Sequence, residues 1–174
     1  MSSDWNTSSF NNDWTILTQS GNQWLNTTIS SYSGTHSIMV NNFSNNAGDI
    51  TEAISPSYNF STLSSPTLTY KWAFAKKLSG GNDQFIIYYS TDCGNTWTIK
   101  SAKGGSSMAT SNATNSPFTP TLNDWDSTSI DLSSLANESN VRFKFRFKNN
   151  GGNNFYIDDI NLMEAISTDI NTIK

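Results

Sequence analysis

The sequence predicts an all-β protein, a two-sheet antiparallel β-sandwich of jelly-roll type. Many short segments alternate apolar and polar residues, which is the period of a strand with one buried face. Aromatic residues make up 13% of a chain that is only 35% hydrophobic, so rings must supply much of the core. No segment sustains a helical period, and only residues 132–139 could hold one helical turn. The 174 residues fit one such domain.

The N-terminal half contains three short candidate strands and one long one. The short candidates are residues 14–17, 37–40 and 50–54. The longer strand is predicted at residues 68–74, where the large apolar residues occupy alternate positions and therefore lie on one face.

The C-terminal half predicts two pairs of strands. Residues 85–89 and a returning strand are joined by the turn 92–95, which indicates a hairpin. Residues 141–148 form the clearest strand, with an apolar set facing the core and four cations on the opposite face. The Gly/Asn-rich turn 149–154 then leads into a last strand at 155–162.

Antiparallel strands with one apolar face must pack sheet against sheet to bury it. Connections of uneven length, notably residues 103–123, favour a jelly-roll or Greek-key sandwich over a simple meander. We expect an N-terminal extension at 1–9, the domain at 10–162 and a tail or linker at 163–174, where the alternation is lost. That tail is expected to lead towards a following domain.

Charge and composition exclude several classes of function. The net charge of −4 argues against a nucleic-acid binder, which needs a basic surface. No run of about 18 apolar residues is present, so no membrane span is expected. The first residues lack the pattern of a signal peptide, so the chain reads as a segment of a larger secreted protein. We expect a monomer.

The sequence does not predict an enzyme. His36 is the single histidine, so a zinc-binding pair is excluded, and Cys93 has no other histidine to act as its base. No Gly-X-Ser-X-Gly nucleophile motif occurs. Asp158 and Asp159 are adjacent in a strand, so we expect their side chains to point to opposite faces and not to flank one glycosidic bond.

Three pieces of the sequence resemble one known group of domains. They are residues 90–97, Trp125 ahead of 130–133, and residues 152–160. Together they resemble the MAM-like, cleaved-adhesin-type jelly roll found C-terminal to secreted pappalysin-type metallopeptidases and in gingipain adhesin regions. The resemblance implies an extracellular accessory domain with a structural calcium ion at a sandwich edge. It departs from the family at residues 10–11, Phe-Asn, where members often carry Phe-Glu and use the Glu to help hold calcium.

Asp158 is the main candidate metal ligand. The residues that share its face by strand alternation are Tyr156, Ile160 and Leu162. Because that face is apolar, the carboxylate needs a metal ion, a basic side chain or several backbone N–H groups. Calcium binds carboxylate and amide oxygens, and the loop 41–49 offers Asn42 and Asp49 as further candidates. Calcium binding and satisfaction without metal both stay open here.

A candidate binding face lies on the polar sides of three strands. Its residues are Arg142, Lys144 and Arg146 on one strand, Tyr88 on a second and Lys71 on a third. If these strands are neighbours, they form a basic, partly aromatic patch. Aromatic rings stack on sugar faces, and cations pair with sulfate or carboxylate groups. The alternative is a solvated outer face whose cations prevent edge-to-edge strand pairing.

Two functions follow from these features. The first is a non-catalytic extracellular module, secreted or at the cell surface, which binds polysaccharide or cell-surface glycan and targets an attached enzyme. The second is a structural, protein-interaction or adhesion module that packs against a neighbouring catalytic domain and has no glycan affinity. The first predicts aromatic side chains beside polar groups, and the second predicts an apolar patch.

Overall fold

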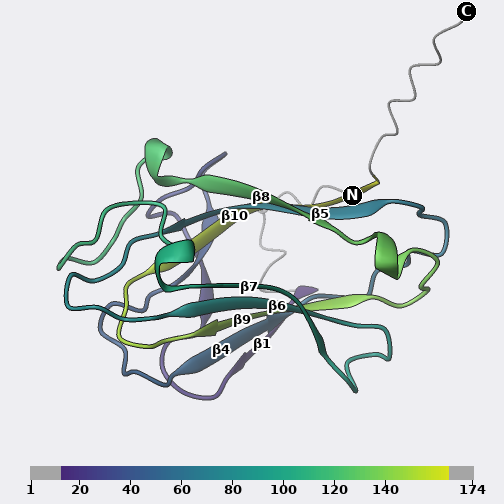
Figure 1. The fold of residues 1–174 in the computed structure, drawn as a ribbon, viewed down its shortest axis with the longest axis horizontal. Helices are drawn as coiled ribbons and strands as arrows, with labels where there is room; N and C mark the ends of the chain where they lie inside the picture. Colours follow the sequence, from purple (N-terminus) through teal and green to yellow (C-terminus); the bar gives the residue numbers. More distant parts are fainter. Residues whose placement is uncertain (1–12, 165–174) are drawn as a thin grey trace, which may run out of the picture.

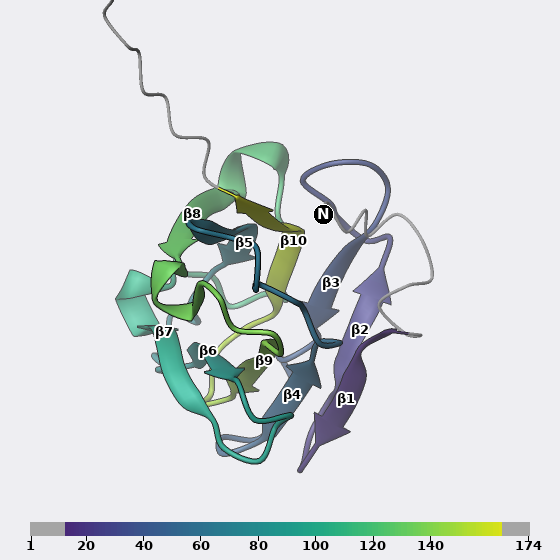
Figure 2. The same ribbon diagram turned by 90° about the vertical axis from the view of Figure 1, so that its right-hand side faces the viewer.

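The computed structural model of the protein describes residues 13–164. Ten strands form two five-stranded antiparallel sheets that face each other, as Figures 1 and 2 show. The front sheet has the order β1-β4-β9-β6-β7, and the back sheet has the order β2-β3-β10-β5-β8. The predicted all-β sandwich is therefore confirmed. Within the described residues, no helix is long and apolar enough to cross a membrane.

The front sheet contains β1 (Thr15–Thr18), β4 (Ile50–Ile54), β9 (Arg142–Lys148), β6 (Gln84–Ser90) and β7 (Thr98–Gly104). The back sheet contains β2 (Trp24–Thr27), β3 (Ser37–Val40), β10 (Phe155–Glu164), β5 (Pro66–Phe74) and β8 (Asp126–Asp131). Three short 3-10 turns lie at Gly105–Ser107, Leu122–Asp124 and Ser133–Leu135. β10 continues through the first two residues of the predicted tail. Residues 1–12 and 165–174, with the predicted extension and the rest of the tail, lie outside the described residues.

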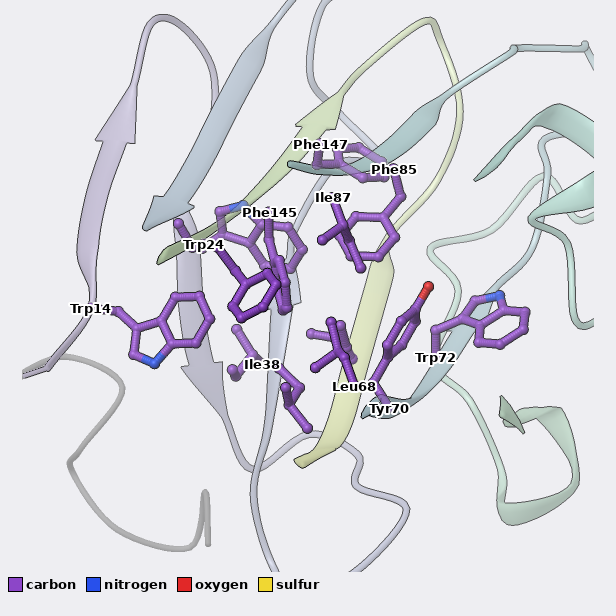
Figure 3. Close-up of a cluster of buried hydrophobic side chains, with 14 of the residues drawn as sticks. Trp14, Trp24, Ile38, Leu68, Tyr70, Trp72, Phe85, Ile87, Phe145 and Phe147 are labelled. Atoms are coloured by element: carbon purple, nitrogen blue, oxygen red, sulfur yellow. The ribbon is translucent and has the colours of Figure 1, made fainter. Parts of the chain in front are cut away.

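The core between the sheets is built around aromatic rings (Figure 3). The ring of Phe85 lies 4.8 Å from that of Phe155, 5.7 Å from Phe145, 5.8 Å from Tyr70 and 6.1 Å from Trp24, measured between centroids. Three of these contacts are edge-to-face, the arrangement that the ring quadrupole favours. Residues from both sheets thus meet at one ring, as the alternation of apolar residues requires.

A β-bulge interrupts the alternation of β10. The register of β10 against β5 shifts by one residue after Asp158, and Asp159 has a positive φ of 46°. Because of the extra residue, Ile160 turns into the core between the sheets, whereas Tyr156 and Asp158 lie on the opposite face. The expectation that Asp158 shares a face with Ile160 and Leu162 is therefore wrong.

The outer face of the back sheet carries a second apolar layer. The buried members of this layer are Met39, Ala73, Ala75, Phe118 and Tyr156, with Leu25 and Trp125 packed against them. The Tyr156 hydroxyl donates to the Phe118 carbonyl at 3.1 Å, which fixes the covering loop to the sheet. The back sheet is therefore apolar on both faces in this region.

Candidate functional site

The outer face of the front sheet brings most of the predicted patch together. β6 pairs with β9, which places Tyr88 opposite Lys144 and Ile86 opposite Arg146. Arg142 lies further along the same strand, where its Nε donates to Ser57 Oγ at 2.7 Å. The strands that carry Tyr88 and the three cations are therefore neighbours, as the predicted patch requires.

Lys71 does not join this patch. It lies on β5 in the back sheet, opposite Ser127 and Asp158. Its Nζ lies 4.3 Å from the centre of the Tyr32 ring. The strand alternation of Lys71 was predicted correctly, but the outer faces of the two sheets point in opposite directions. The prediction that Lys71 belongs to the same patch as Tyr88, Lys144 and Arg146 is therefore wrong.

Lys144 lies at the centre of the front patch, which we define as Glu52, Tyr88, Trp97, Lys144 and Arg146. The Lys144 Nζ lies 4.6 Å from the centre of the Trp97 ring and 5.0 Å from that of Tyr88. It also lies 3.5 Å from Glu52 Oε1. The residue is only 8% exposed, so the two rings cover most of this cation.

Arg146 and Glu52 form the polar part of the front patch. The Arg146 Nε donates to Glu52 Oε1 at 2.6 Å, and its Nη1 donates to the Tyr88 hydroxyl at 3.2 Å. Glu52 is 6% exposed, so both cations of the patch share one nearly buried carboxylate. These contacts hold the Tyr88 ring and the guanidinium in fixed positions, which lowers the entropy cost of binding a ligand.

Sequence reasoning missed Glu52 and Trp97. Glu52 lies within a short strand, and nothing in the sequence shows that β4 pairs with β9. Trp97 follows the predicted turn 92–95 and lies just before β7, at the end of the hairpin turn. Asp92 fixes this turn by accepting from the Thr96 amide at 2.9 Å and from the Thr96 hydroxyl at 2.6 Å. These hydrogen bonds lower the Asp92 pKa to about 2.

Asp158 is surrounded by N–H donors. Its Oδ2 accepts from the backbone amides of Tyr32 at 2.7 Å and Ser33 at 3.2 Å, and its Oδ1 accepts from the Asp159 amide at 2.7 Å. Burial raises the pKa of Asp158 above its usual value, although these hydrogen bonds act in the opposite direction. Calcium needs oxygen ligands, so this arrangement does not fit a calcium site.

Asn42 and Asp49 lie together at a different place, around a small cavity. The cavity is lined by the apolar side chains of Val40 and Phe147 and by seven oxygen-bearing side chains, which belong to Ser20, Asn22, Asn42, Asn45, Asp49, Thr51 and Asn149. The Asn42 Nδ2 donates to Asp83 Oδ2 at 3.1 Å and to the Asn153 carbonyl at 3.1 Å. The Asn42 Oδ1 is buried and has no hydrogen-bond partner among the described residues. These oxygen donors fit the chemistry of calcium better than Asp158 does.

Asp83 is the buried carboxylate that Asn42 contacts. Its Oδ1 accepts from the backbone amides of Asn150 at 2.7 Å and Gly152 at 3.0 Å. Burial raises its pKa. A Cβ atom at Gly152 would lie 1.8 Å from Asp83 Oδ2, so only glycine fits at that position. This network fixes the 149–154 turn beside the cavity.

The groups considered for catalysis do not form a nucleophile–base pair. The His36 Nδ1 lies 2.8 Å from the neighbouring Thr35 hydroxyl, while Cys93 Sγ accepts from Asn140 Nδ2 at 3.3 Å. Asp158 and Asp159 both contact Ser33, through its amide at 3.2 Å and its hydroxyl at 2.5 Å. The expectation that these two carboxylates point apart is wrong, because the bulge brings both towards the same loop.

Comparisons with known proteins agree with this fold. In sequence comparisons, no protein-family model and no curated protein matches the chain. The K1 cleaved adhesin domain of Lys-gingipain from Porphyromonas gingivalis is similar in structure, with a TM-score of 0.65, 14% identity and coverage of 95% of this chain and 98% of that one. TmCBM61 in complex with β-1,4-galactotriose gives a TM-score of 0.55 at 10% identity, covering 87% of this chain and 88% of that one.

A third similar structure is the family 11 carbohydrate-binding module from Clostridium thermocellum in complex with a β-1,3-1,4-mixed-linked tetrasaccharide. Its TM-score is 0.52 at 13% identity, covering 88% of this chain and 90% of that one. The fold is therefore shared with cleaved adhesin domains and carbohydrate-binding modules, and the predicted resemblance to gingipain adhesin domains is confirmed at the level of structure. At these identities the likeness concerns the fold alone.

Proposed function

We propose that this chain is an extracellular accessory module that binds polysaccharide or cell-surface glycan through the front patch. The observation that carries the proposal is the placement of two partly exposed aromatic rings, Tyr88 and Trp97, beside the paired Arg146 and Glu52. Rings of this kind stack on sugar faces, and the polar groups can hydrogen-bond to sugar hydroxyls. The sandwich fold, shared with modules solved in complex with oligosaccharides, supports the same function.

The charge of the front patch favours an acidic glycan. Lys144 and Arg146 carry two positive charges against the single negative charge of Glu52, and Arg142 lies further along the same face. This positive surface belongs to a protein with a net charge of −4. Arg146 can pair with a carboxylate or sulfate group while a sugar ring stacks on Tyr88 or Trp97. Binding to an acidic polymer should therefore weaken as salt increases.

Affinity electrophoresis against matched neutral and acidic polysaccharides tests this function. We expect one polymer to retard the protein, and the variants Trp97→Ala and Arg146→Ala to lose that retardation. Leu78→Ala serves as the control, because Leu78 is an exposed apolar side chain that does not belong to the front patch. Thermal melts of all variants establish that they fold. Retardation that survives when Trp97→Ala and Arg146→Ala are combined in one protein contradicts the proposal.

A second candidate function rests on an apolar groove. The groove measures about 630 Å³, and its apolar lining residues are Tyr58, Phe60, Leu63, Pro66, Leu162 and Met163. Such a groove supports the alternative of a module that packs against a neighbouring domain of its parent protein. If no polysaccharide retards the protein, this becomes the favoured function. Leu63→Asp should then abolish binding to the neighbouring domain supplied as a separate chain.

We also propose a structural calcium ion at the cavity of Asn42 and Asp49. The support is the set of side-chain oxygens around that cavity and the buried Asn42 Oδ1 without a partner. Adding calcium after treatment with chelator should raise the melting temperature of the wild type and of Asp158→Asn, but not that of Asp49→Ala. A melt that chelator leaves unchanged contradicts calcium binding. A calcium response that is lost in Asp158→Asn and kept in Asp49→Ala assigns the ion to Asp158 instead.

A further inference from the structure

The outer face of the back sheet holds a groove that the front patch does not include. The groove measures about 520 Å³ and crosses three adjacent strands, β10, β5 and β8, which form one layer in Figure 1. Its side chains that face outward are Thr69, Lys71, Ser127, Ser129, Asp159 and Asn161. A groove of this size can hold one or two sugar units.

The strand register arranges these polar groups in rows. Thr69 lies opposite Ser129 on β8 and opposite Asn161 on β10, and Lys71 lies opposite Ser127. Three hydroxyl groups and one amide therefore line a surface that crosses the strands. Both serines are exposed, as expected for the outer face of the edge strand β8.

The bulge in β10 builds one wall of the groove. Asp159 lies at the positive-φ position of the bulge, and its side chain accepts from the Ser33 hydroxyl at 2.5 Å. The Asn161 Nδ2 donates to the Asp159 carbonyl at 2.8 Å, which orients the amide. Without the extra residue in β10, Asp159 would point into the core between the sheets. The bulge therefore presents a carboxylate and an amide on the groove side.

Lys71 and an aromatic pair lie beside the groove. The Lys71 Nζ lies 4.3 Å from the centre of the Tyr32 ring, and Tyr32 contacts Trp125 edge-to-face at 6.3 Å. Both rings are partly exposed. Among the residues that line the groove, Lys71 and Asp159 carry one charge of each sign. The buried Asp158 carboxylate lies opposite Lys71, outside this lining. The lining differs from the front patch, where two cations share one carboxylate.

We propose that this groove is a second glycan-binding site, which takes neutral, hydroxyl-rich sugar units. Its row of hydroxyl and amide groups, its single cation and single carboxylate and its neighbouring rings match such a ligand. The identity of the ligand as a glycan rests on the proposed function. Because the groove and the front patch lie on opposite sides of the sandwich, the module is bivalent and can cross-link two polymer chains.

Amide NMR titration of the whole chain tests the second site, with β-1,4-galactotriose and a β-1,3-1,4-mixed-linked glucan tetrasaccharide as neutral probes. Shifts should appear at Thr69, Lys71 and Ser129 in the wild type. Ser129→Leu fills the groove, and we expect it to weaken these shifts by about tenfold in apparent affinity. Ser134→Leu is the matched control, because Ser134 is also exposed and does not line the groove.

The outcomes separate the two sites. Groove shifts that persist in Trp97→Ala and disappear in Ser129→Leu support the second site. Shifts confined to Tyr88 and Trp97 overturn it and leave the proposed front site intact. Shifts confined to the groove support the second site, and they agree with a front site that takes acidic glycans, which the electrophoresis experiment tests separately. If neither probe shifts the groove residues, or if Ser129→Leu binds as well as Ser134→Leu, the second site is wrong.

Discussion

The outer faces of the two sheets differ in what covers them. On the front sheet, charged side chains point outward and pair with one another, as Glu52 does with Lys144 and Arg146. On the back sheet, a loop covers much of the outer face and buries Tyr156 beneath Phe118. The front face is therefore available for a ligand, while the part of the back face beneath the loop contributes a second core.

Buried acidic groups on the two faces show the same contrast. Glu52 is compensated by two cationic side chains, whereas Asp158 is compensated by three backbone amides. The partners of Glu52 are side chains on the outer face of the front sheet, whereas most of the partners of Asp158 are backbone groups of a loop. We infer that Glu52 serves a surface that binds, and that Asp158 serves a loop that must stay in place.

The largest loss of stability is expected for Tyr156→Ala, on the part of the back sheet's outer face that the loop covers. This change leaves a cavity in the second apolar layer and removes the hydrogen bond to the Phe118 carbonyl. The free energy of unfolding should fall by about 3–5 kcal/mol, as for other buried aromatic residues. Urea denaturation measures the loss. Tyr88→Ala on the open face is the matched control, and a loss of equal size there would remove the difference between the faces.

The next effect is expected for Asp158→Asn. An amide cannot accept all three backbone N–H groups, so we expect a loss of about 2–3 kcal/mol at pH 7. Because burial raises the Asp158 pKa in the folded protein, the wild type takes up a proton on folding between the usual aspartate pKa, about 3.9, and the raised value.

The contribution of Asp158 to the free energy of unfolding of the wild type therefore increases as the pH falls from the raised pKa towards the usual aspartate pKa. It decreases as the pH rises through the same range. The variant lacks this dependence. Denaturation of both proteins at pH 7 and at about pH 5 should show a larger difference at the lower pH. A difference that shrinks at the lower pH would mean that Asp158 has a lowered pKa in the fold.

Strands in which apolar and polar residues alternate clearly could be predicted from the sequence. The predicted ranges 37–40 and 50–54 coincide with β3 and β4, and residues 68–74 lie within β5. β8 was missed because its sequence, Asp126–Asp131, is mainly polar and has few apolar side chains to show the period. β2 was missed because its two large apolar residues, Trp24 and Leu25, are adjacent and pack on opposite faces, so its four residues show no alternation.

The candidate sites were harder to predict, because they depend on the pairing of distant strands. Alternation placed Lys71 and Lys144 correctly on outer faces, but it could not show that the two strands belong to different sheets. The bulge at Asp159 was also hidden, since a positive φ at a residue other than glycine leaves no mark in the sequence. That single residue changes the side to which Ile160 points.

A smaller loss of stability is expected for Glu52→Gln, on the outer face of the front sheet. Glutamine keeps the shape of the side chain but leaves Lys144 without its nearby carboxylate. Because both groups are nearly buried, we expect a loss of about 1–2 kcal/mol, which high salt should change little. Urea denaturation at low and high salt measures it. A neutral result would show that the two rings alone stabilise Lys144.

The smallest effect is expected for Ile99→Thr, which also lies on the open face, opposite Tyr88. Ile99 is 57% exposed, so the stability should change by no more than about 0.5 kcal/mol. Melting at several protein concentrations checks this value together with the expected monomer. A loss that appears only at high concentration would mean that copies of the chain bury this face against each other. The front face would then be an interface between copies of the chain. Both outer faces would be covered, the back face by a loop of the same chain and the front face by a second copy.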